Sequence, residues 1–152
     1  MFRPMRRIKN QMNDIDALKL LGNCKEGTLG TISENGYPYT VVVNYVFYNG
    51  KIYFHSAKEG HKIDNIIKNN KVSFSVFGNV EIVEAEFTTK YQSVTLFGKA
   101  KILPGNSEIL KELIKKYSGN FVQKGNKYVE ESYATTILVE IEIEHLTGKE
   151  SL

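Results

Sequence analysis

The segment around which the fold is organised reads GKIYFHSAKEGHKIDNII, residues 50–67. Its first half alternates apolar and polar side chains with a period of two, which predicts a β-strand. Its second half repeats isoleucine at helical spacing, at Ile63, Ile66 and Ile67. The sequence therefore predicts a strand that runs directly into a helix.

The junction between this strand and this helix has the pattern of a capping box, with Ser56 and Glu59 three residues apart. In such a box, the two side chains bond backbone N–H groups that a helix start leaves free. We expect the helix to begin there, or within a turn of it at Gly60. Three side chains add donors around this start: Lys58, His61 and Lys62. Free N–H groups and the positive end of the helix dipole then favour a bound phosphate. The alternative is a capped surface helix with solvated lysines.

Length and composition indicate one domain over residues 1–152, with 41% hydrophobic residues and enough chain to bury roughly 70% of its unfolded surface. The net charge of +3 is spread along the chain, which is a poor footprint for nucleic acid. Apolar runs such as Val41–Val43 are too short to span a bilayer, so we expect no membrane segment. The basic stretch Met1–Arg7 precedes no apolar run, and Cys24 has no partner for a disulfide. Together these features predict a cytoplasmic protein.

Before the organising segment, residues 1–12 are expected to form a solvated N-terminal arm. Asn13 or Asp14 is expected to cap a short helix that ends at Gly22. Its buried face is predicted to contain Ile15, Leu18 and Leu21. Three strands over residues 28–33, 37–47 and 51–56 follow, joined by tight turns at Asn35-Gly36 and Asn49-Gly50, because Asn-Gly suits the positive φ angles of type I′ hairpins.

In the strand predicted over residues 37–47, neither face is clearly polar. Val41 and Val43 share one face, and Val42 and Val46 share the other. We therefore expect both faces to be covered, by a helix, a ligand or another subunit.

After the organising segment, alternation predicts a strand over residues 72–83 that continues past Gly78, a polar loop over 84–90, and a strand over 93–103 that ends at Pro104-Gly105. An amphipathic helix is predicted from Asn106 or Ser107 to Tyr117. Residues 120–133 are ambiguous, with a short helix over 127–133 as one interpretation, and the last strand covers 137–144. Hairpin-length connections favour antiparallel pairing in an α+β or barrel-centred domain.

Several common functional motifs are absent from the sequence. The glycines form no dinucleotide-binding fingerprint, and no G-x-S-x-G motif marks a hydrolase. The stretch Gly22–Thr28 lacks the lysine of a P-loop and precedes a strand. His55, His61 and His145 have no zinc-binding spacing, so we expect no metal site.

A succession of short motifs resembles the nitroimidazole-resistance (Nim) family, within the pyridoxamine 5′-phosphate oxidase-like, FMN-binding split-barrel superfamily. The motifs are, in order, Met1-Phe2-Arg3-x-Met5-Arg6-Arg7; Gly36-Tyr37-Pro38-Tyr39 with Asn44-Tyr45-Val46; Tyr53-Phe54-His55-Ser56-Ala57-Lys58-x-Gly60-His61-Lys62-x-Asp64; Phe87-Thr88-Thr89; Ser93-Val94 with Phe97-Gly98-Lys99; and Ile143-Glu144-His145-x-Thr147-Gly148-Lys149-Glu150. They span nearly the whole chain.

The resemblance implies a mainly β, α+β fold, a six-stranded antiparallel split barrel with peripheral helices, which forms a homodimer with FMN across the interface. By similarity, the flavin ring lies along Pro38, Tyr39, Thr40, Val41 and Asn44. The phosphate is expected near His55, Ser56, His61 and Lys62, and Ser93 is expected to supply a further polar contact. Many relatives carry a proline in the second strand, where this chain has three valines.

The resemblance also implies a function, an FMN-dependent reductase of a small molecule such as a nitroimidazole or another nitroaromatic. In this hypothesis the catalytic residue is His55, because imidazole exchanges protons near neutral pH and nitro reduction consumes protons. The alternative for His55 is a purely structural hydrogen bond. The alternative for the protein is a non-catalytic binder of flavin or haem, with His55 or His61 as the haem ligand.

Overall fold

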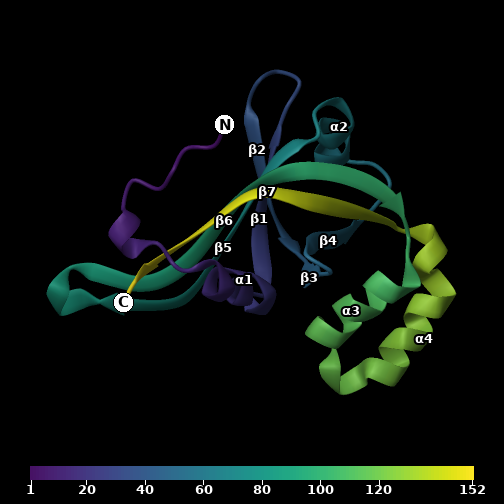
Figure 1. Cartoon of the computed structure of the whole chain (residues 1–152). Coiled ribbons are helices and arrows are strands. Elements are labelled where there is room, and N and C mark those ends of the chain that lie inside the picture. Colours follow the sequence, from purple (N-terminus) through teal and green to yellow (C-terminus); the bar gives the residue numbers. More distant parts are fainter.

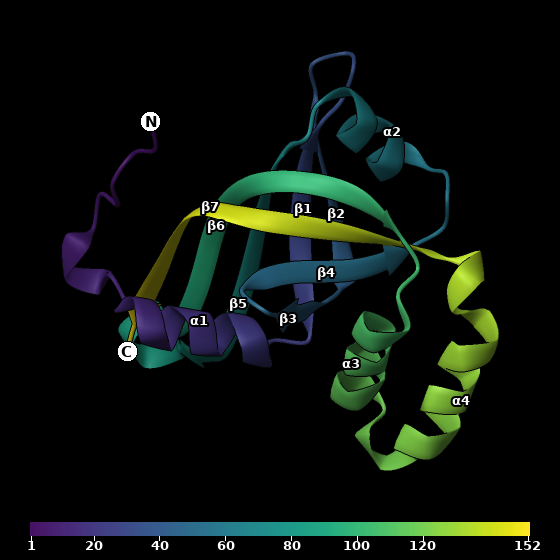
Figure 2. The same ribbon diagram turned by 45° about the vertical axis from the view of Figure 1, so that its right-hand side comes forward.

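The computed structural model describes all residues from Met1 to Leu152 and contains one antiparallel sheet that curls into a half-barrel (Figures 1 and 2). The seven strands are β1 (Glu26–Ile32), β2 (Pro38–Asn44), β3 (Val46–Tyr48), β4 (Lys51–Ser56), β5 (Lys71–Val83), β6 (Thr88–Pro104) and β7 (Ile137–Ser151). Their order across the sheet is β2-β1-β5-β6-β7-β4-β3. The four α-helices are α1 (Asp14–Asn23), α2 (His61–Lys68), α3 (Ser107–Tyr117) and α4 (Val122–Ser132). None of them has the length and apolar character that crossing a bilayer requires.

The expectation of six strands is wrong, because the predicted strand over residues 37–47 breaks at Tyr45 into β2 and β3. These two strands form opposite edges of the sheet: β2 pairs with β1, whereas β3 pairs with β4. A single residue therefore connects the two edges. The sheet can satisfy this connection only by curling on itself, which produces the half-barrel.

Tyr45 turns the chain at this corner, and α3 supplies the hydrogen bonds that a ladder would otherwise provide. The Tyr45 N–H donates to the Tyr117 hydroxyl at 2.9 Å, and the Tyr45 carbonyl accepts from Lys116 Nζ, also at 2.9 Å. Lys116 Nζ lies 3.8 Å from the centroid of the buried Tyr45 ring. Burial and the nearby Lys25 lower the pKa of Lys116 to about 8. The corner is thus a fully bonded, buried junction.

Two hydrophobic cores lie on the two sides of the curled sheet. The inner core fills the half-barrel and contains Phe54, Phe74 and Val139. The outer core lies under the α3–α4 hairpin and contains Tyr53, Leu113 and Leu138. Successive residues of β4 and β7 are therefore buried on opposite faces, since both faces are covered there.

The positions of the predicted turns are confirmed by the backbone. Asn49 and Gly50 have φ 51° and 77°, as a type I′ turn requires, whereas in the turn at Asn35-Gly36 only Gly36 has a positive φ, 87°, so that turn is not of type I′. The strand that continues past Gly78 is confirmed as β5, with a register shift between Gly78 and Glu81. Residues 88–90, expected in a loop, pair with 81–83, so β5 and β6 form a long hairpin that projects away from α3 and α4 (Figure 1).

Several helix predictions need correction. In α1, Ile15 is 80% exposed and Leu18 is also exposed, because the buried face consists of Ala17, Leu20 and Leu21. Gly22 lies inside α1, whose C-cap is Cys24. The ambiguous segment after α3 forms α4 from Val122 onward, earlier than the expected start at residue 127. The α3 helix begins as predicted, with the Asn106 side chain accepting from the N–H of Ile109.

The N-terminal arm is only partly solvated. Arg3, Arg6 and Arg7 are exposed as expected. The end of the arm instead binds β7: Gln11 bridges to Lys149, and Met12 is buried. Backbone pairing with the last strand holds this part in place.

Candidate functional site

The β2 strand lies at an edge of the sheet, and its outward face is open. Alternation separates the five β2 residues expected to contact a flavin: the side chains of Pro38, Thr40 and Asn44 are exposed, whereas Tyr39 and Val41 are half-buried. Val42, on the outward face, is 63% exposed, so no helix of the chain covers this face, and a ligand or another subunit remains as the expected cover.

A split in the barrel begins at Tyr45, between β2 and β4. The β3–β4 register pairs Val46 with Tyr53, and its continuation would set Asn44 opposite His55. The chain turns at Tyr45 instead, and β2 leaves β4 to pair with β1. Both Asn44 and His55 are exposed on outward-facing positions. The two strands that carry most of the expected site residues therefore flank one opening.

The helix α2 begins at His61, with Gly60 as its N-cap. This agrees with the expected start at Gly60, within a turn of the predicted capping box. The capping box is wrong: no side chain caps α2, because Ser56 is buried at the end of β4 and its hydroxyl donates to the Ala57 carbonyl. Gly60 has φ 143°, a conformation that side chains disfavour. The first N–H groups of α2 consequently have no acceptor within the chain.

The His61 ring, at the start of α2, contacts the β1–β2 hairpin. Its Nε2 lies 3.0 Å from the Ser33 hydroxyl, and its centroid lies 3.9 Å from that of Tyr39. Asn65 Nδ2 donates to the Ser33 and Thr31 hydroxyls at 3.2 and 2.9 Å. The structure thus joins the expected residues His61 and Tyr39 at one end of the split. Sequence reasoning missed the polar residues beneath them, although a polar Asn65 beside the buried Ile66 was a signal.

Lys62 is half-buried beside His61, and none of the three ion pairs includes it. It makes no hydrogen bond within the chain, and the exposed Lys58 makes none either. The two lysines around the α2 start thus have no ion-pair partner in the chain.

His55 points outward from β4 toward a cavity of about 210 Å³ beneath the α3–α4 hairpin. Its imidazole has no hydrogen-bond partner in the chain. Ser56, the next residue, points inward, and its carbonyl accepts from the Thr136 hydroxyl at 3.0 Å. The two neighbours expected at the phosphate therefore point in opposite directions.

Ser93 lies on the outward face of β6, opposite Phe77 and Lys149. Three strand spacings, roughly 14 Å, separate β6 from β2. Within one chain, Ser93 is therefore not next to the other expected flavin contacts.

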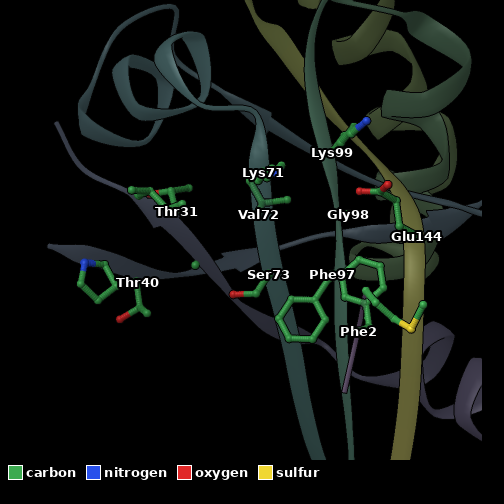
Figure 3. A pocket seen from close by; sticks show the side chains of 14 residues that line it. Phe2, Thr31, Thr40, Lys71, Val72, Ser73, Phe97, Gly98, Lys99 and Glu144 are labelled. Carbon is green, nitrogen blue, oxygen red and sulfur yellow. The ribbon is translucent and has the colours of Figure 1, made fainter. Parts of the chain in front are cut away.

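A second hollow, of about 580 Å³, lies on the outward face of the sheet, and Figure 3 shows Ser73 between Thr40 and Phe97 across its floor. Register places Gly30 in the same row, where a side chain would collide with the Ser73 hydroxyl. The Phe2 ring of the arm stacks on Phe97 and on His145, with centroids 5.4 and 5.0 Å away. A stacked aromatic wall thus borders a flat floor.

Lys71 and Lys99 lie directly opposite each other at the end of this hollow, outside every ion pair. Like charges in that arrangement repel. Sequence reasoning assigned no site role to either lysine, nor to Gly30 or Phe2, although a glycine inside a strand pattern is a signal of close approach.

A family profile described as pyridoxamine 5′-phosphate oxidase matches residues 14–150. The chain belongs to this family. No protein of curated function matches the sequence significantly. The pyridoxamine 5′-phosphate oxidase-like superfamily suggested by the sequence motifs is thereby confirmed, and with it the split, barrel-centred architecture.

Solved structures share this fold at low sequence identity. A conserved hypothetical protein from Mycobacterium tuberculosis has a TM-score of 0.82 at 17% identity, over 97% of this chain and 90% of the other. A candidate 5-nitroimidazole antibiotic resistance protein from Bacteroides thetaiotaomicron has a TM-score of 0.66 at 18% identity, over 92% and 86%. An FAD- and haem-binding protein from Mycobacterium smegmatis has a TM-score of 0.70 at 15% identity, over 93% and 73%. At these identities the likeness establishes the fold alone.

Proposed function

We propose that this chain binds FMN in the split between β2 and β4 and acts as a flavin-dependent reductase of small aromatic compounds. The observation that carries the proposal is the split itself. It has an open edge strand on one side, an uncapped helix start at its end, and an unbonded imidazole on the other side. Family membership and flavin-binding relatives of the same fold support the assignment.

The α2 start fits the phosphate of the cofactor. Its free N–H groups and the positive end of the helix dipole attract an anion. The ammonium group of Lys62, which has no partner in the chain, adds a charge-assisted donor. Gly60 leaves these N–H groups accessible because it has no side chain.

The β2 edge fits the ring of the cofactor. Only one side of this strand pairs, with β1, so the N–H and C=O groups of the other side remain available. Thr40 and Asn44 add polar side chains on the outward face. The bound flavin would accept and deliver electrons. The chain's own residues would orient it, exclude water and deliver protons.

His55 is the residue we assign to proton delivery. It lies on β4 beside the split, its side chain points toward the cavity beneath α3 and α4, and no group of the chain bonds its imidazole. An imidazole without a partner in the chain can donate a proton to a bound substrate.

A homodimer is part of this proposal. The outward face of the sheet leaves apolar side chains exposed: Val42 at 63%, Phe77 at 59% and Ile82 at 72%. A second copy packed on this face would cover them. It would also allow Ser93 of one protomer to reach the flavin of the other, which the spacing within one chain does not allow.

A haem-binding function is the second candidate, since one relative of the same fold binds both FAD and haem. His55 is the available axial ligand in this case, because His61 bonds Ser33. The visible absorption spectrum of freshly purified protein separates the candidates, because flavin and haem absorb at different wavelengths and haem gives an intense Soret band.

The test is an FMN titration of two matched lysine variants. Lys62→Ala should weaken binding by roughly ten- to a hundredfold, the effect of losing about 1.5 to 3 kcal/mol of charge-assisted hydrogen bonding. Lys99→Ala removes the same charge from the second hollow and should leave the affinity unchanged. If Lys99→Ala weakens binding and Lys62→Ala does not, the phosphate lies on the outward face of the sheet and the proposed site is wrong.

A further inference from the structure

The cavity beside His55 has apolar walls that belong to the outer core. Leu110 and Leu113 on α3 and Val129 on α4 line it, and each is less than a tenth exposed. Its volume is about 210 Å³. An apolar protein cavity of about 150 Å³ is enough to hold benzene, so this one has room for a single ring with a substituent.

The opening follows from how α3 and α4 pack. Near the closed end of the helical hairpin, Gly125 of α4 lies directly against Ile114 of α3, so closely that any side chain at position 125 would collide with it. Toward the sheet, between Leu110 and Ser132, the two helices line a cavity instead. Figure 2 shows this open end of the hairpin facing the end of β4.

The polar groups around the cavity are almost all used within the chain. The hydroxyls of Ser132, Thr135 and Thr136 donate to the carbonyls of Tyr128, Ser132 and Ser56 at 2.6, 2.8 and 3.0 Å. No lysine, arginine, aspartate or glutamate lines the walls. Among the lining side chains, only those of His55 and Tyr128 have polar atoms without a partner in the chain, and the Tyr128 side chain is 67% exposed to solvent.

We propose that this cavity is a binding site for an uncharged single-ring aromatic compound, held between the apolar walls with one polar substituent bonded to His55. The idea that such a compound is the reductase substrate rests on the proposed function, whereas its binding does not. A carboxylate or phosphate on the ring would lose its hydration without gaining a cation, so charged analogues are excluded. The α3–α4 hairpin therefore sets the substrate class.

The test compares two probes that differ in charge, 4-nitrobenzyl alcohol and 4-nitrobenzoate, by calorimetric titration of the full-length protein without reductant. The alcohol should bind at least tenfold more tightly than the benzoate. Ser132→Leu places a side chain in the cavity and should weaken alcohol binding at least tenfold. Ser132→Ala is the matched control: it removes the same hydroxyl, fills nothing and should bind like the parent.

Circular dichroism checks that the variants fold, and Thr135→Leu, at an exposed position on the cavity rim, provides a second way of filling it. Equal binding of both probes, or full binding of the alcohol to both filled variants, would overturn the proposal. FMN titration of Ser132→Leu separates this inference from the proposed function. Unchanged FMN affinity with lost alcohol binding supports the ring site, whereas alcohol binding to a parent that binds no FMN refutes only the flavin site.

Discussion

The bonds that α3 makes to the Tyr45 corner predict the effect of removing one hydroxyl. In Tyr117→Phe, the buried N–H of Tyr45 loses the acceptor that lies 2.9 Å away. A buried donor without a partner costs about 1 to 3 kcal/mol, whereas the Tyr45 carbonyl keeps its bond from Lys116. The free energy of unfolding should therefore fall by about 2 kcal/mol, which for a chain of this size lowers the Tm by roughly 4 to 8 °C.

Urea denaturation at fixed protein concentration measures this change, since association would otherwise shift the apparent stability. Tyr37→Phe is the control, because the Tyr37 side chain is 73% exposed and its hydroxyl bonds nothing in the chain. The Tyr117→Phe protein should also bind FMN more weakly, because the corner at Tyr45 sets where β2 and β4 separate. A Tyr117→Phe protein as stable as the control would show that the corner does not need the bond from Tyr117 and would refute this account of closure.

Three further predictions concern His55 as a general acid, the pKa of the half-buried Lys116, and the homodimer. His55→Gln should keep FMN bound yet slow nitroaromatic turnover by roughly a hundredfold, as loss of a general acid does; unchanged turnover at saturating FMN assigns His55 a structural role. Lys116 has a pKa of about 8 in the folded protein and 10.5 in the unfolded chain. Between pH 8 and pH 10.5 the unfolded chain therefore binds more protons, and the free energy of unfolding should rise with pH. Above pH 10 the raised pKa of Tyr53, about 12, makes the free energy of unfolding fall with pH. The increase due to Lys116 is therefore measured from about pH 8 to 10, and it should disappear in Lys116→Met. Light scattering should give twice 17.3 kDa for the parent and the monomer mass for Val42→Asp; a parent monomer with stoichiometric flavin contradicts the dimer.

The parts of the fold that could be predicted are those that local sequence controls. Asn49-Gly50 adopts positive φ angles at little cost, and Asn106 caps α3 with its own side chain, so each signal acts over a few residues. The break at Tyr45 has no such signal. Val41 to Phe47 reads as one continuous strand, and only the bonds from Lys116 and Tyr117, more than seventy positions later in the chain, show that it turns.

The candidate site could be predicted in part for a similar reason. The α2 start was expected within a turn of its true position, but Ser56 could not cap it because its side chain belongs to the barrel interior. Alternation along β2 places the Thr40 side chain outward and the Tyr39 side chain inward. The family resemblance alone does not show which β2 side chains face outward. The two hollows depend on side chains from four or more elements, so no single segment of sequence could indicate them.

The place of β7 in the sheet has a consequence for how the protein is made. β7 is the last strand along the chain, yet it lies between β6 and β4. Until it pairs, the sheet consists of a four-stranded part and the small β3–β4 hairpin, which share no ladder. The edges of β6 and β4 then have unpaired backbone groups of the kind that other chains can pair with. Pairings between distant strands also form slowly. The nascent chain, rather than the finished protein, is therefore the state in which aggregation competes most strongly with folding.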